Sequence, residues 1–122
     1  MRRVVHFELG AQEPARCAEF YKQVFGWTIN KWPGPVEYWL AVTGPDSKPG
    51  INGGIMRHQD GGPRTVNTIE VESVEEFAAK VAENGGQVVV PKMAIPGVGW
   101  QIYCLDTEGN LFGIHQPDPA AK

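Results

Sequence analysis

The stretch HFELGAQEPARCAEFYKQVFGW, residues 6–27, decides how the beginning of this chain folds. Its first four residues alternate polar and apolar side chains, which is typical of a half-buried strand. A helix is predicted next, because the following apolar side chains share the spacing of one helix face. They are Cys17, Phe20, Tyr21, Val24 and Phe25. Gly26 ends this helix, and short strands are predicted over residues 27–30, 37–42 and 53–57.

The second half of the chain repeats this pattern. A strand over residues 65–71 leads into a helix that begins at a Ser73–Glu76 capping box and stops at Gly85-Gly86. Its apolar face consists of Val74, Phe77, Ala78, Val81 and Ala82. Strands follow over residues 87–90, 100–106 and 111–116, with a loop over residues 91–99. We therefore predict one α+β domain over residues 1–122. It contains two βαβββ modules, about 1–58 and 65–117, joined by a linker over residues 59–64.

The composition argues against nucleic acids and anionic membranes as binding partners. The chain has 122 residues, of which 42% are hydrophobic and 20% charged, with a formal net charge of −3. A chain without a basic surface is a poor match for nucleic acid or an anionic membrane. Its apolar runs are too short for a membrane span, and its start lacks a signal-peptide apolar region. We expect a cytoplasmic protein with Cys17 and Cys104 as free thiols, a disulfide between them being the alternative.

Strand alternation separates an apolar face from a polar one. On the first strand, Phe7 and Leu9 share the face that we expect under the helix, whereas His6 and Glu8 share the opposite face. The same rule places further polar side chains on that inner face, namely Thr68, Glu70 and His115. Polar residues on the inner faces of several strands indicate a wet cavity rather than a sealed core.

Two motifs resemble the vicinal oxygen chelate superfamily, which includes glyoxalase I, bleomycin-resistance proteins and extradiol dioxygenases. The first is the opening strand histidine followed by EFYKQVFGW, residues 19–27. The second is DTEGNLFGI, residues 106–114, with Thr107 where proline is usual. The resemblance implies a curled, barrel-like mixed sheet with helices on its outer face, a cleft for a small-molecule ligand, and a homodimer.

Metal-bearing members of that superfamily hold a divalent ion with one residue from each of four strands. By resemblance, His6 matches the first of these positions, and Val66 and Gly113 match two others. The remaining strand offers only residues 53–56, which are Gly, Gly, Ile and Met. Valine and glycine donate no ligand atom. We therefore expect no cofactor and no metal of the usual kind. A rewired divalent site built from His6, Glu8 and His115 is the alternative.

Candidate site residues follow from the inner face and from the aromatic side chains near it. His6 and Glu8 are candidate catalytic groups, because imidazole titrates near neutrality and a partly buried carboxyl has a raised pKa. The alternatives to a catalytic role are that His6 only hydrogen-bonds a neighbouring residue and that Glu8 is only solvated or salt-bridged. Candidate substrate-binding residues are Trp32, Tyr38, Thr68, Glu70, Trp100 and His115.

Three functions remain open at this point. The first is a glyoxalase-like or bleomycin-resistance-like protein that binds a small molecule without the usual metal. The second is a lyase or isomerase that transfers protons with His6 or Glu8. The third is a non-catalytic partner module. A glyoxalase I activity is not expected, because the resemblance ties that activity to a metal whose ligands are mostly absent. Fold alone does not decide among these functions.

Overall fold

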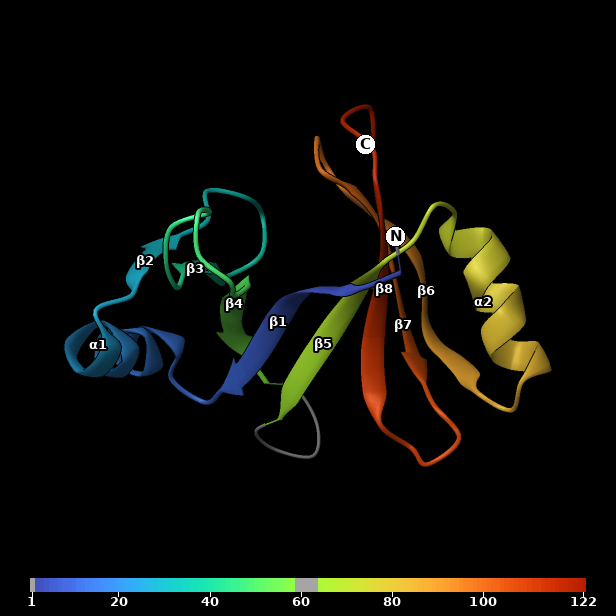
Figure 1. Cartoon of the computed structure of the whole chain (residues 1–122), viewed down its shortest axis with the longest axis horizontal. Coiled ribbons are helices and arrows are strands. Elements are labelled where there is room, and N and C mark those ends of the chain that lie inside the picture. Colours follow the sequence, from blue (N-terminus) through green and yellow to red (C-terminus); the bar gives the residue numbers. More distant parts are fainter. Residues whose placement is uncertain (1, 59–63) are drawn as a thin grey trace. The chain divides into compact units, whose positions relative to one another are not determined.

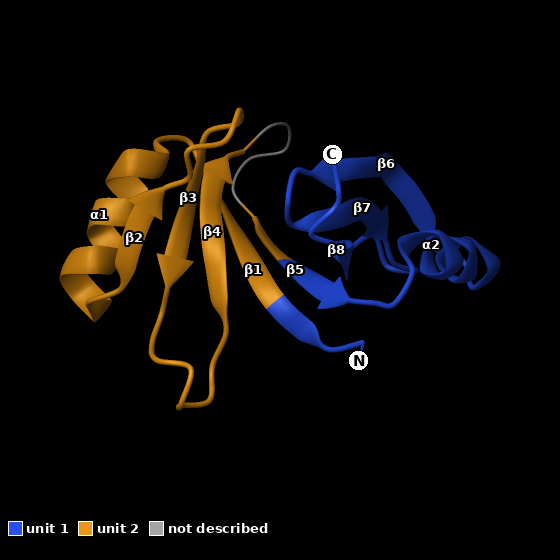
Figure 2. Ribbon diagram, turned by 90° about the horizontal axis from the view of Figure 1, so that it is seen from above, with its two compact units in different colours: residues 1–5, 67–122 blue, residues 6–66 orange. Residues whose placement is uncertain are grey.

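The computed structural model describes residues 2–58 and 64–122, and these form two compact units (Figure 2). The N-terminal unit is His6–Val66, and the C-terminal unit is Asn67–Lys122 together with Met1–Val5. The predicted linker, residues 59–64, lies outside the described residues except for Arg64.

The N-terminal module has the order strand, helix and three strands (Figure 1). Its strands lie in the order β2-β3-β4-β1, with β1 parallel to β4 and the other pairs antiparallel. The elements are β1 (Val4–Ala11), α1 (Pro14–Phe25), β2 (Thr28–Lys31), β3 (Tyr38–Val42) and β4 (Asn52–Arg57). Helix α1 covers one sheet face, where Ala18 packs into a buried cluster with Ile29, Ala41 and Ile55.

The C-terminal module repeats this architecture. Its strands lie in the order β5-β8-β7-β6, with β5 parallel to β8 and the other pairs antiparallel. The elements are β5 (Thr65–Glu70), α2 (Val74–Glu83), β6 (Gln87–Ile95), β7 (Gly99–Leu105) and β8 (Leu111–Pro117). Val74 of α2 is fully buried against Ile102, Cys104 and Ile114. The predicted α+β class with two βαβββ modules, each with a mixed sheet and a covering helix, is confirmed.

The helix ends show the expected local chemistry. Gly26 adopts φ 73°, a left-handed conformation that suits glycine, and its amide donates to the Lys22 carbonyl. At the start of α2, the Ser73 hydroxyl accepts a hydrogen bond from the Glu76 amide at 3.2 Å. The Glu76 carboxylate lies 3.5 Å from the Lys80 ammonium. Of the two hydrogen bonds of the predicted capping box, the structure therefore shows the one that the Ser73 hydroxyl accepts.

Two sequence predictions need correction. Only Cys17 and Tyr21 of the predicted apolar face of α1 pack on the core, while Phe20, Val24 and Phe25 are 56%, 55% and 61% exposed. The short side chain of Ala18 lets the helix lie close to the sheet on a narrower stripe. In addition, β6 continues through Pro91 to Ile95, where a loop was predicted. Register shifts on both sides of Val90 accommodate the proline, which cannot donate to a strand ladder.

The remaining sequence predictions concern thiols and membranes. Cys17 and Cys104 are both free, so the disulfide alternative is wrong. Among the helices of the described chain, none is long and apolar enough to cross a membrane.

Candidate functional site

Five positions of the N-terminal sheet share the face opposite α1. Directly paired residues of neighbouring strands lie on the same side of a sheet. The register pairs Glu8 of β1 with Gly54 of β4, and Tyr38 of β3 with Met56 of β4. His6 precedes Glu8 by two residues and therefore shares its face. Alternation along β1 was predicted to separate these residues from Leu9, which packs on the core beneath α1.

The Tyr38 hydroxyl joins His6 and Glu8 into one hydrogen-bonded chain. It lies 2.6 Å from His6 Nε2, and it donates to Glu8 Oε2 at 3.0 Å. A phenol has a single proton, and here that proton points to Glu8. His6 Nε2 must therefore carry the proton that it shares with Tyr38, which leaves Nδ1 as the unprotonated nitrogen of the neutral ring.

Burial sets the protonation state of the His6 ring. Burial lowers the pKa of the His6 imidazole below its ordinary value of 6.5, so the neutral ring predominates at neutral pH. Glu8 is only 9% exposed. A buried carboxylate needs hydrogen-bond donors, and the Tyr38 hydroxyl is one of them. The neutral His6 imidazole is therefore hydrogen-bonded through Nε2 to the Tyr38 hydroxyl, which is hydrogen-bonded in turn to the Glu8 carboxyl group.

Gly54 makes room for this arrangement. A Cβ atom at residue 54 would lie 2.1 Å from the Tyr38 ring, so any side chain there would displace the ring. Trp32 supports the ring from another side, edge-on with 6.5 Å between centroids. The Trp32 amide also donates to the Tyr38 carbonyl at 2.7 Å. Trp32, Tyr38, His6 and Glu8, all candidates from the sequence, are thus brought together in one unit.

A second polar group occupies the matching face of the C-terminal sheet. Thr68 of β5 pairs with Gly113 of β8, and Gln101 of β7 pairs with His115 of β8. His115 Nδ1 lies 3.0 Å from Gln101 Oε1. Thr68 and Gln101 are both buried, and within residues 2–58 and 64–122 the Thr68 hydroxyl has no hydrogen-bond partner. Sequence reasoning missed Gln101, although a lone amide between Trp100 and Ile102 on a buried strand was a usable signal.

Of the other candidates of this unit, Glu70 of β5 pairs with His115 of β8, whereas Trp100 makes its contacts elsewhere. The backbone of Glu70 exchanges hydrogen bonds with Arg2 and Arg3. The indole of Trp100 packs against the core cluster and lies 4.5 Å from the Lys92 ammonium. Its N–H donates to Asp118 at 2.9 Å. These contacts place Trp100 within the packing of the C-terminal unit.

The family's metal positions do not fit a metal in this chain. Val66 is 5% exposed and belongs to the apolar core, while Gly54 and Gly113 supply no ligand atom. The space beside each glycine is taken, by the Tyr38 ring in one case and the Gln101 amide in the other. No group of three or more His, Cys, Asp or Glu side chains suited to an ion occurs among residues 2–58 and 64–122.

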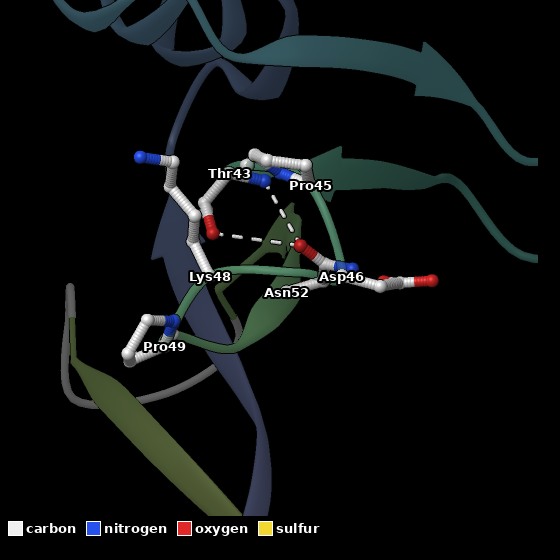
Figure 3. Close-up of a pocket in the computed structure, with 8 residues that line it drawn as sticks. Thr43, Pro45, Asp46, Lys48, Pro49 and Asn52 are labelled. Atoms are coloured by element: carbon white, nitrogen blue, oxygen red, sulfur yellow. Dashed lines mark hydrogen bonds between the residues drawn. The ribbon is translucent and has the colours of Figure 1, made fainter.

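A shallow pocket lies at the loop between β3 and β4 (Figure 3). It has a volume of about 140 Å³ and is lined by loop residues including Asp46 and Lys48. The Asn52 side-chain oxygen accepts hydrogen bonds from the Thr43 amide and hydroxyl, which fixes the mouth of the loop. No candidate from the sequence lines this pocket.

Comparison with known proteins supports the family suggested by the sequence. Residues 3–44 match the family model described as bleomycin resistance protein-like N-terminal. No curated protein matches the chain significantly in sequence.

Solved structures show the same fold at low identity. Hypothetical protein BH1468 from Bacillus halodurans C-125 has a TM-score of 0.76 and 15% identity, covering 99% of this chain and 98% of its own. Methylmalonyl-CoA epimerase from Mycobacterium tuberculosis has a TM-score of 0.70 and 14% identity, covering 95% and 88%. A Streptomyces coelicolor methylmalonyl-CoA epimerase variant in complex with 2-nitronate-propionyl-CoA has a TM-score of 0.72 and 12% identity, covering 100% and 99%. The family model thus matches the opening of the chain, and the solved structures share its fold; both findings agree with the resemblance to the vicinal oxygen chelate superfamily.

Proposed function

We propose that this protein is a small-molecule enzyme of the lyase or isomerase type that transfers a proton without a divalent metal. The observation that carries the proposal is the hydrogen-bonded chain from His6 through Tyr38 to Glu8. Such a chain is a familiar way to orient a base and to stabilise the charge that it acquires.

In the proposed step, His6 Nδ1 accepts a proton from a carbon next to a carbonyl group of the substrate. The imidazole then becomes positively charged, while its Nε2–H still donates to Tyr38. The Glu8 carboxylate stabilises that charge through the Tyr38 hydroxyl. Because burial lowers the pKa of His6, the ring starts neutral and is ready to accept the proton at neutral pH.

The test follows hydrogen exchange at such a carbon. Methylmalonyl-CoA is the first probe, because two structural neighbours are named for it. Incubation in D₂O, followed by mass spectrometry, should show deuterium uptake with the wild-type protein and at least a tenfold loss in His6→Gln, which corresponds to about 1.4 kcal/mol of barrier. Tyr21→Phe is the control, since its ring stacks on Trp27 on the α1 side of the sheet. If methylmalonyl-CoA and a panel of simpler thioesters show no uptake above buffer, the proton-transfer proposal fails.

A second candidate is binding without chemistry, as in a drug-binding member of the family. The match of residues 3–44 to the bleomycin resistance protein-like model favours it. Trp32 and Tyr38 would then supply an aromatic surface for a flat ligand. Quenching of tryptophan fluorescence by aromatic antibiotics, lost in Trp32→Ala, with no proton exchange on any probe, would favour this candidate over the enzyme.

Two parts of the proposal concern ligand contacts and assembly. We include Thr68, Glu70 and His115 as ligand contacts of the C-terminal module, to be tested by alanine variants in the same assays, and leave out Trp100 because its indole packs on the core and donates to Asp118. We also propose a homodimer, which the family resemblance supports. Sedimentation equilibrium should give twice the 13.4 kDa chain mass, and a single-chain mass at micromolar concentration would exclude it.

A further inference from the structure

Gly54 and Gly113 occupy equivalent positions in the two modules. Gly54 pairs with Glu8 across a parallel β1–β4 ladder, and Gly113 pairs with Thr68 across a parallel β5–β8 ladder. In each module, the antiparallel neighbour of the strand that holds the glycine carries a polar side chain. This polar residue pairs with the residue two positions after the glycine. That side chain is Tyr38 in the first module and Gln101 in the second.

Each of these side chains covers the glycine of its own module. A Cβ atom at Gly54 would lie 2.1 Å from the Tyr38 ring, and one at Gly113 would lie 2.5 Å from Gln101 Nε2. Neither glycine has a positive φ, so backbone conformation does not require glycine there. The glycines are needed for space. Gly44 differs, because a Cβ atom there would meet nothing within 4 Å.

The covering side chains are themselves held by polar neighbours. Tyr38 is fixed between His6 and Glu8. Gln101 is fixed by His115, whose Nδ1 meets its side-chain oxygen, so that the amide nitrogen is the end that lies over Gly113. The Thr68 hydroxyl also lies over Gly113, 3.2 Å from a Cβ atom built there.

We propose that Tyr38 and Gln101 fill, from the neighbouring strand, the volumes that metal-ligating side chains at residues 54 and 113 would occupy. A divalent ion and the His6–Tyr38–Glu8 chain are then alternatives in this scaffold. A glutamate at residue 54 cannot enter without displacing the Tyr38 ring, and displacing the ring breaks both of its hydrogen bonds. A single substitution therefore does not restore a metal site, which distinguishes this arrangement from the simple loss of a ligand.

The first experiment measures whether Tyr38 and Gly54 share one volume. The urea midpoints of wild type, Gly54→Ala, Tyr38→Ala and the double variant form a double-mutant cycle. We expect Gly54→Ala to lower the midpoint strongly in the wild type and by less than half as much in the Tyr38→Ala background. Gly44→Ala is the control and should shift the midpoint equally in both backgrounds. The same cycle with Gly113→Ala and Gln101→Ala tests the second module. Additive shifts in either module overturn the proposal there.

The second experiment titrates Zn²⁺ and Ni²⁺ alone by calorimetry. Wild type and Gly54→Glu should bind no more tightly than their His6→Ala versions, whereas Gly54→Glu/Tyr38→Ala should gain at least tenfold in affinity, dependent on His6. One His6-dependent ion per wild-type chain overturns the proposal. So does equal affinity in Gly54→Glu with and without Tyr38→Ala, because Tyr38 then excludes nothing. Neither experiment uses a substrate, so these outcomes are independent of the proton-transfer assay.

Discussion

Replacing Tyr38 with phenylalanine isolates the hydroxyl group on which the proposed site depends. The substitution removes the contact with His6 at 2.6 Å and the bond donated to Glu8 at 3.0 Å. It keeps the ring, which fills the space over Gly54 and touches the edge of Trp32. The change is therefore confined to hydrogen bonding, with no cavity and no overpacking.

The expected cost follows from the two bonds. A hydrogen bond between neutral groups contributes about 1 kcal/mol, and a bond to a charged group contributes roughly 1.5–3 kcal/mol. The bond to His6 is of the first kind and the bond to Glu8 of the second. Since Glu8 is only 9% exposed, water replaces the lost donor poorly. We expect Tyr38→Phe to lower the free energy of unfolding by roughly 2.5–4 kcal/mol.

The assay is urea unfolding at neutral pH, followed by tryptophan fluorescence and analysed by linear extrapolation. Tyr21→Phe is the matched control: its ring stacks on Trp27 with 4.7 Å between centroids, and we expect a change within about 0.5 kcal/mol. A Tyr38→Phe cost no larger than that of Tyr21→Phe would refute the hydrogen-bonded chain. A Glu8→Gln variant should show non-additivity with Tyr38→Phe, because both substitutions remove the same interaction.

Three further predictions concern pH, the core and a helix end. Because burial lowers the pKa of His6 below 6.5, the unfolded state binds its proton more tightly. Thermal stability should therefore fall as the pH drops below 6.5, and His6→Gln should reduce that fall. Ile55→Ala, at a fully buried position of the N-terminal core, should cost about 2–5 kcal/mol by urea unfolding, whereas Ile51→Ala, 37% exposed, should cost far less. Ser73→Ala should cost about 0.5–2 kcal/mol, because the hydroxyl caps the Glu76 amide; an unchanged unfolding curve would contradict the cap.

The repeat and the faces of its strands could be predicted from the sequence because both depend on local geometry. Phe7 and Leu9 fall on the side of α1, and His6 and Glu8 on the other side, as alternation requires. The helix stop at Gly26 and the serine cap of α2 are likewise local. Residues that carry chemistry could therefore be assigned to a face before their partners were known.

The partners on that face could not be predicted. His6 and Tyr38 are 32 residues apart, and their contact depends on the register of β3 on β4 and of β4 on β1. A shift of one residue in either ladder would turn Tyr38 away from the face of His6. The same dependence explains why Gln101 was missed, since its role appears only once it is paired opposite His115.

The sequence by itself determined two βαβββ modules, the polar face of each sheet and the absence of a ligand side chain at Gly113. Alternation, helix periodicity and residue chemistry act over a few neighbouring residues, so a sequence contains them directly. Only the tertiary structure decided that β6 runs through Pro91, that three of the five residues on the predicted apolar face of α1 are exposed, and that Tyr38 and Gln101 cover the two glycines. These outcomes depend on which strands pair and in which register, and such long-range contacts are fixed by the packing of the whole module.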